Sequence, residues 1–155
     1  MDERLQDVAR LYARLIDAWN RRDAAGMAAL YAPKGSQVGF DGSPANGPEE
    51  IKALLEPIFA DHPTARFVTR IRETRAIGPG AAMLRAVAGM IPPGEKDIMK
   101  ERNAIQTLVA SRGDGGSWRV EMFHNTPAAF DGRPEEAEKL SAELRAAMVE
   151  EREPA

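Results

Sequence analysis

The chain of 155 residues contains no cysteine. This absence excludes disulfide bonds, cysteine nucleophiles, iron–sulfur clusters and zinc sites with cysteine ligands. Histidine is also scarce: His62 and His124 are the only two, and their separation does not fit a pair of metal ligands. We therefore expect no metal site.

Long apolar runs, charge of one sign and cofactor motifs are missing as well. No apolar segment approaches the ~18 residues of a membrane-spanning helix, and residues 1–4 lack the pattern of a signal peptide. The net charge is −3, from 21 basic and 24 acidic residues, so no positive field attracts nucleic acid. The sequence has no Gly-x-Gly-x-x-Gly after a strand, no flavin or haem signature and no Gly-x-Ser-x-Gly elbow. We expect a cytoplasmic protein without cofactor, membrane or nucleic-acid partner.

Helical patterns dominate both ends of the chain. Apolar residues recur at helical spacing over about residues 3–20. Asp23 can cap a second, shorter helix, and Gly47-Pro48-Glu49-Glu50 is a good start for a third. A last helix, with an acidic polar face, follows Pro134. We expect three helices before the main strands and one after them.

The middle of the chain predicts strands over about residues 64–77, 81–91, 102–111 and 118–126, after a short strand over 36–40. The connections between the four long strands are short and rich in glycine and proline, which favours antiparallel neighbours. This order predicts an α+β fold, in which three N-terminal helices cover a strongly curved antiparallel sheet and enclose a cone with a pocket inside. We expect a cone domain over residues 1–131 and an acidic helical extension over 132–155.

The last strand ends in a polar cluster, His124-Asn125-Thr126-Pro127. Alternation groups His124 with Trp118, Val120 and Met122 on the more apolar face, which we expect to line the cone. Since the pKa of histidine lies nearest neutrality, an inward His124 is a candidate acid/base or hydrogen-bond donor to a ligand oxygen, with Asp41 or Asn103 as its partner. Two alternatives stay open: a partly exposed His124 that holds the following loop, and an Asp41 that belongs to a turn.

Further side chains are candidates for binding a ligand. Asn103 and Thr107 could line the pocket as neutral hydrogen-bonding groups, and Met122 shares the face of His124. Gln106 lies on the other face of its strand, and the pattern does not decide which face is inward. The aromatic residues predicted to form core and pocket wall together are Trp19, Tyr31, Phe40 and Phe59.

Several motifs, in their order and spacing, resemble the SnoaL-like branch of the nuclear-transport-factor-like superfamily. They are Asn20-Arg21-Arg22-Asp23, Leu30-Tyr31-Ala32-Pro33-Lys34-Gly35, Gly47-Pro48-Glu49-Glu50-Ile51 and Asn103-Ala104-Ile105-Gln106-Thr107-Leu108-Val109. Gly116-Ser117-Trp118-Arg119-Val120, with Phe123-His124-Asn125-Thr126-Pro127, resembles the SgcJ/EcaC subgroup. The resemblance covers about residues 4–130.

The resemblance implies a cone-shaped fold, commonly a homodimer through the outer sheet face, with relatives that include ketosteroid isomerase, polyketide cyclases and dehydratases. The isomerase-like relatives carry a carboxylate base where this chain has Gly39, and their tyrosine donor falls near Leu15, so both groups are missing here. Two functions stay open. One is a cofactor-free isomerase, cyclase or dehydratase that acts by proton transfer on a carbonyl-bearing, largely apolar, polyketide-like compound. The other is a non-catalytic ligand-binding or accessory dimerisation domain.

Overall fold

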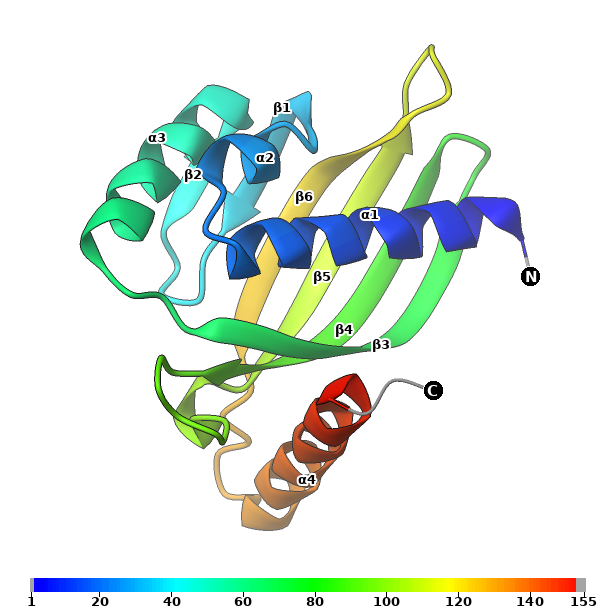
Figure 1. Cartoon of the computed structure of the whole chain (residues 1–155). Helices are drawn as coiled ribbons and strands as arrows, with labels where there is room; N and C mark the ends of the chain where they lie inside the picture. Colours follow the sequence, from blue (N-terminus) through cyan, green and yellow to red (C-terminus); the bar gives the residue numbers. More distant parts are fainter. Residues whose placement is uncertain (1, 153–155) are drawn as a thin grey trace.

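The computed structural model describes residues 2–152, which form a six-stranded sheet with helices on both of its faces (Figure 1). The elements are α1 (Glu3–Asn20), α2 (Ala24–Ala28), β1 (Tyr31–Val38), β2 (Pro44–Asn46), α3 (Gly47–Asp61), β3 (Arg66–Ile77), β4 (Ala81–Ile91), a 3-10 turn η1 (Lys100–Arg102), β5 (Ala104–Arg112), β6 (Trp118–Pro127) and α4 (Pro134–Arg152). The strand order is β2-β1-β6-β5-β4-β3. The predicted α+β class is confirmed.

The sheet is mixed rather than wholly antiparallel. The four long strands pair antiparallel as predicted, but β1 runs parallel to β6. Parallel neighbours need a crossover connection of a dozen or more residues, and most of the chain lies between these two strands. The strand β1 also begins at Tyr31, earlier than predicted, because the Leu30 carbonyl already accepts the Val120 N–H at 2.9 Å.

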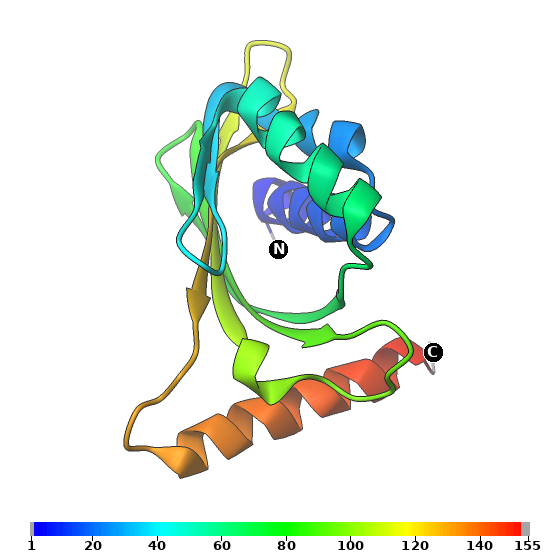
Figure 2. The same ribbon diagram turned by 90° about the vertical axis from the view of Figure 1, so that its left-hand side faces the viewer.

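The sheet curves strongly around α1, and α2 and α3 complete the cover on the same side (Figure 2). The predicted helical face of α1 lies in this inner core, where Val8 and Leu15 are fully buried. Ile51 from α3 and Leu108 from β5 are fully buried in the same cluster. The predicted arrangement of three helices on one face of a curled sheet is therefore present.

A β-bulge interrupts β6. Met122 and Val120 lie opposite consecutive residues of β5, so the backbone of Glu121 between them has no register partner on that strand. An extra residue reverses the alternation of side chains beyond it. Val120 and Phe123, three positions apart, consequently both belong to the inner core. The single inward face predicted from Trp118 to Thr126 is therefore wrong beyond the bulge.

The terminal helix α4 packs on the outer face of the sheet, on the side away from α1 (Figure 2). Its buried residues Leu140, Leu144 and Met148 contact a second apolar cluster that includes Val68 of β3 and Val87 of β4. The backbone of β4 approaches the helix closely at Gly89. A Cβ atom there would lie 3.1 Å from Leu144 Cδ1 and 3.1 Å from Ile98 Cγ2.

Ion pairs connect the acidic face of α4 to the arginines of β3. The pairs are Arg66–Glu151 at 2.6 Å, Arg70–Glu150 at 2.8 Å and Arg72–Glu143 at 2.6 Å. All six side chains keep substantial solvent exposure, and pairs of this kind contribute little to stability. None of the helices within residues 2–152 is long and apolar enough to cross a membrane.

We predict that apolar packing, not ion pairing, attaches α4 to the sheet. Leu144→Ala should lower the free energy of unfolding by about 2–5 kcal/mol, because it leaves a cavity at a fully buried site. Glu143→Gln, which removes the ion pair with Arg72, should cost less than about 1 kcal/mol. Urea unfolding measures both variants. An equal or larger loss for Glu143→Gln would contradict the prediction.

Both tyrosines of the chain, Tyr12 and Tyr31, are buried in the inner core. Burial raises the pKa of each phenol well above its usual value, and a side-chain hydrogen bond from Thr69 partly opposes the rise in the pKa of Tyr12. Each phenol has a higher pKa in the folded than in the unfolded protein. Its contribution to the free energy of unfolding is therefore complete below about pH 10, the pKa of an unfolded tyrosine, and is lost as the pH rises further.

We therefore predict that neither tyrosine ionises near pH 10 while the protein is folded. Absorbance at 295 nm, followed during alkaline titration, should rise only together with the loss of far-UV circular dichroism. A tyrosinate signal that precedes unfolding would show that at least one phenol is accessible to solvent.

Candidate functional site

A cavity of about 90 Å³ lies inside the cone, on the concave side of the sheet. Its lining is mostly apolar and combines α1, α2 and the loop after β1 with four strands. The lining residues are Trp19, Met27, Gln37, Gly39, Phe40, Phe67, Met90, Phe123 and Asn125. None of these side chains titrates, so the polar chemistry of the cavity rests on the two carboxamides.

The aromatic wall of the cavity is held in place by hydrogen bonds and ring contacts. Trp19 donates its indole N–H to the Ala65 carbonyl at 2.9 Å, and its ring packs edge-on against Phe59 with centroids 5.2 Å apart. The Phe67 ring lies 5.3 Å from Trp19, centroid to centroid. Asn20 bonds both backbone groups of Phe67, at 2.8 and 3.2 Å. The end of α1 and the start of β3 therefore form one fixed corner.

Gln37 is the first polar group of the cavity. Its side chain is buried on β1, and its Oε1 accepts a hydrogen bond from the Tyr31 phenol at 2.8 Å. Within residues 2–152 no acceptor is bound to Gln37 Nε2. The amide nitrogen is therefore the group that Gln37 offers to the cavity.

Asn125 is the second polar group, and its carboxamide is oriented in the same sense. Asn125 Oδ1 accepts from Gln106 Nε2 at 2.8 Å, and Gln106 Oε1 accepts from the Tyr12 phenol at 2.5 Å. No described residue accepts from Asn125 Nδ2. The cavity is thus apolar with two N–H donors, and both carboxamide oxygens already have protein partners.

The structure corrects the orientation predicted for His124. His124 lies between the inward residues Phe123 and Asn125, and its register partners are Thr107 on β5 and Val38 on β1. It therefore points to the outer face of the sheet, because the bulge at Glu121 reverses the alternation. Among the described residues, His124 makes no side-chain hydrogen bond or ion pair.

Thr107 and Met122 require the same correction. Thr107 alternates with the inward residues Gln106 and Leu108, and Met122 precedes the inward Phe123, so both belong to the outer face. Thr107 lies on the outer face because its neighbour Gln106 lies on the inner one. The sequence pattern did not decide which of these two faces is inward.

Asp41 lies in the turn between β1 and β2. This is the second of the two alternatives predicted for it, a turn residue and not a partner of His124. Its carboxylate accepts the Ser43 N–H at 2.9 Å, Gly42 adopts φ of 91°, and Asp41 itself is exposed and outside the cavity lining. The hydrogen bond from Ser43 lowers the pKa of Asp41, with a smaller contribution from the charge of Arg102. A carboxylate with a lowered pKa is a poor proton acceptor.

The other predicted binding residues occupy three different places. Trp19 and Phe40 are part of the cavity wall, and the Arg102 guanidinium lies 5.3 Å from the Phe40 ring centroid. Tyr31 and Phe59 lie one layer behind the wall. Asn103 does not reach the cavity: its side chain is buried against α4, where Nδ2 donates to Ser141 Oγ at 3.0 Å.

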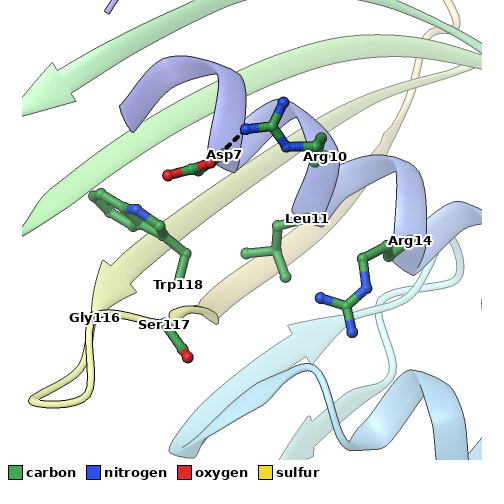
Figure 3. Close-up of a pocket in the computed structure, with 7 residues that line it drawn as sticks. All are labelled: Asp7, Arg10, Leu11, Arg14, Gly116, Ser117 and Trp118. Atoms are coloured by element: carbon green, nitrogen blue, oxygen red, sulfur yellow. Dashed lines mark hydrogen bonds and ion pairs between the residues drawn. The ribbon is translucent and has the colours of Figure 1, made fainter. Parts of the chain in front are cut away.

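A second, larger hollow of about 330 Å³ lies between α1 and the hairpin that joins β5 to β6 (Figure 3). Arg10 and Arg14 project into it from one side of α1, and Asp7 pairs with Arg10 at 2.6 Å. Arg10, Arg14 and Ser117 are exposed and only Leu11 of its lining is buried, whereas ligand sites bury most of the ligand surface against apolar groups. The cone cavity is therefore the better candidate site.

Within the described residues, no group of three or more His, Asp or Glu side chains could hold a metal ion.

Solved structures share this fold over most of their length. A domain of unknown function with a cystatin-like fold from Nostoc punctiforme is 23% identical, with a TM-score of 0.77, and the match covers 97% of this chain and 99% of that one. A ketosteroid isomerase-like protein from Erwinia carotovora atroseptica is 17% identical, with a TM-score of 0.67 and coverage of 83% and 99%. A proposed dehydratase of the NTF2-like family from Streptomyces avermitilis is 16% identical, with a TM-score of 0.66 and coverage of 82% and 97%.

At these identities the structural matches establish the NTF2-like, cystatin-like fold and no activity. No curated protein matches the sequence. The family model of the SnoaL-like domain matches residues 12–98, which is more than half of the chain and contains the second half of α1, all of α3 and the aromatic corner of the cavity. The chain therefore belongs to the SnoaL-like domain family.

Proposed function

We propose that this SnoaL-like domain binds a small, largely apolar molecule with a hydrogen-bond acceptor, such as a carbonyl oxygen, inside the cone cavity. The supporting observation is the orientation of the two carboxamides. The Gln37 oxygen already accepts a hydrogen bond from Tyr31, and the Asn125 oxygen already accepts one from Gln106. The groups that remain for a ligand in the apolar wall are therefore N–H donors. An acceptor on the ligand would give these N–H groups a hydrogen-bond partner within the apolar wall.

The size of the cavity limits the ligand. At about 90 Å³ it is smaller than the roughly 300–1,000 Å³ of pockets for drug-sized molecules. A small ring with one carbonyl group matches this space. A larger polyketide-like compound requires the walls to move, and Met27 and Met90 are the unbranched side chains that can adapt there.

The composition of the lining favours binding over proton transfer. A general acid or base must come within hydrogen-bond reach of the reacting group, and no side chain of the lining titrates. Isomerase, cyclase or dehydratase activity with His124 and Asp41 stays a prediction, as does membership of the SgcJ/EcaC subgroup. The structural matches to an isomerase-like protein and a proposed dehydratase share the fold, while His124 and Asp41 lie outside the cavity of this chain.

We predict that cyclohexanone binds in the cavity and that its carbonyl group adds to the affinity. Methylenecyclohexane is the matched probe, since it has the same shape but no acceptor. NMR titration should shift the methyl signals of Met27 and Met90, which line the cavity, with both probes. If neither probe shifts these signals, the proposed binding function is contradicted.

Variants then identify the donors. Asn125→Leu and Gln37→Met remove one carboxamide each with little change of volume, and each should reduce the preference for cyclohexanone over methylenecyclohexane by roughly 2- to 10-fold. The two probes differ in the free energy of desolvation, but this difference is the same for every variant. It therefore cancels when the ratio of the two affinities is compared between variant and wild type. His124→Gln is the control and should leave both affinities unchanged. A loss of affinity in His124→Gln would instead support the predicted role of His124.

We also propose that the chain forms a homodimer through the outer face of β4, β5 and β6, beside α4. Thr107 stands near the middle of this face, with Arg85 and His124 as its register partners. No helix within residues 2–152 belongs to a cluster with these three residues, which gives a second copy access to them.

Thr107→Arg should therefore shift the protein from dimer to monomer in sedimentation velocity, because it adds a positive charge next to Arg85 at the centre of the proposed interface. Ala142→Arg, on the exposed side of α4, is the matched control and should leave the dimer intact. A wild-type protein that sediments as a monomer at all concentrations contradicts this proposal.

A further inference from the structure

A chain of hydrogen bonds crosses the apolar core behind the cavity. It begins at Tyr12 on α1, passes through Gln106 on β5 and ends at Asn125 on β6. Gln106 is fully buried and Tyr12 is 2% exposed, so water does not compete for these groups. Gln106 and Asn125 are direct cross-strand partners, which keeps their carboxamides in contact. Of the three residues, only Asn125 lines the cavity.

The direction of this chain follows from the single proton of the phenol. When Tyr12 donates to Gln106 Oε1, the Gln106 amide must donate to Asn125 Oδ1, and the Asn125 NH₂ group faces the cavity. In the reverse arrangement Gln106 donates to Tyr12 and Asn125 donates to Gln106. The Tyr12 proton then loses Gln106 as its acceptor, and the Thr69 hydroxyl, which donates to the phenol, would have to turn to accept it. The first arrangement is therefore preferred.

We propose that Tyr12 is a specificity-determining residue that acts from outside the cavity: its phenol proton fixes the Asn125 amide with the N–H group inward, so that the site selects acceptor ligands over donor ligands. The preference for acceptor ligands rests on the proposed function. The orientation of Asn125 rests on the hydrogen-bond chain alone. Tyr12 is a positioning residue, since it does not touch the cavity.

The second carboxamide provides an internal comparison. Tyr31 orients Gln37 in one step, by donating to Gln37 Oε1 at 2.8 Å, and takes no part in the Asn125 chain. Each of the two tyrosines therefore controls one carboxamide. Removal of one phenol oxygen should free its own amide and leave the other unchanged.

Side-chain amide NMR of the ligand-free protein tests the orientation. In Tyr12→Phe, the end of the Gln106 carboxamide that faces residue 12 has no hydrogen-bond partner, whether it is the oxygen or the NH₂ group. The two orientations of Gln106 are then similar in free energy, so the Asn125 carboxamide has no preferred orientation. We expect its NH₂ cross-peaks to double or broaden, while those of Gln37 stay as in the wild type. Tyr31→Phe should produce the opposite pattern. Unchanged, single Asn125 peaks in Tyr12→Phe would overturn the proposal. Gln106→Met, which removes the middle of the chain, should affect Asn125 in the same way.

A double-mutant cycle with the two probes tests the effect on selectivity. Tyr12→Phe should lower the preference for cyclohexanone over methylenecyclohexane by roughly 2- to 10-fold. The same substitution should have no further effect once Asn125 is leucine, but should keep its full effect when Gln37 is methionine. Equal effects of Tyr12→Phe in both backgrounds would overturn the proposal. If neither probe binds the wild type, the proposed function fails, while the amide cross-peaks still decide whether Tyr12 orients Asn125.

Discussion

The β-bulge at Glu121 determines which chemistry the inside of the cone contains. On the inner side it keeps Val120 in the core and brings Phe123 and Asn125 to the cavity, while His124 moves to the outer face. One additional residue in β6 thus exchanges an imidazole for a carboxamide at the ligand site. The change replaces a group that can transfer protons with one that can only donate or accept hydrogen bonds, and the proposed function follows from it.

The buried side chains of Tyr12, Tyr31, Gln37 and Gln106 in the inner core are neutral, and each makes a hydrogen bond. Charged groups inside an apolar cone would be costly unless they were paired, whereas amides and phenols need only hydrogen bonds. Tyr12 and Tyr31 stay protonated because burial raises their pKa values, so each has one proton to donate. Their donations occupy amide oxygens, and the remaining N–H groups of Gln37 and Asn125 give the cavity its preference.

The outer face of the sheet is divided between α4 and the region around His124. The helix covers β3 and β4 through apolar contacts of Leu140, Leu144 and Met148, and its glutamates pair with arginines at the margin. The acidic face of α4 is therefore partly occupied within the chain itself. What remains open on the outer face lies over β4, β5 and β6, where His124 belongs to a surface and not to a cavity.

Local pattern predicted the helices, the four long antiparallel strands and the α+β class, because helical spacing, capping residues and short Gly/Pro loops act within a few residues. It also included among its alternatives the turn that Asp41 forms with Ser43. It could not predict the parallel pairing of β1 with β6, the bulge at Glu121 or the inward face of Gln106. Those depend on register between strands distant in sequence. The sequence by itself determined which elements form; only the tertiary structure decided which side chains meet inside the cone, because a shift of one residue in a strand moves every following side chain to the opposite face.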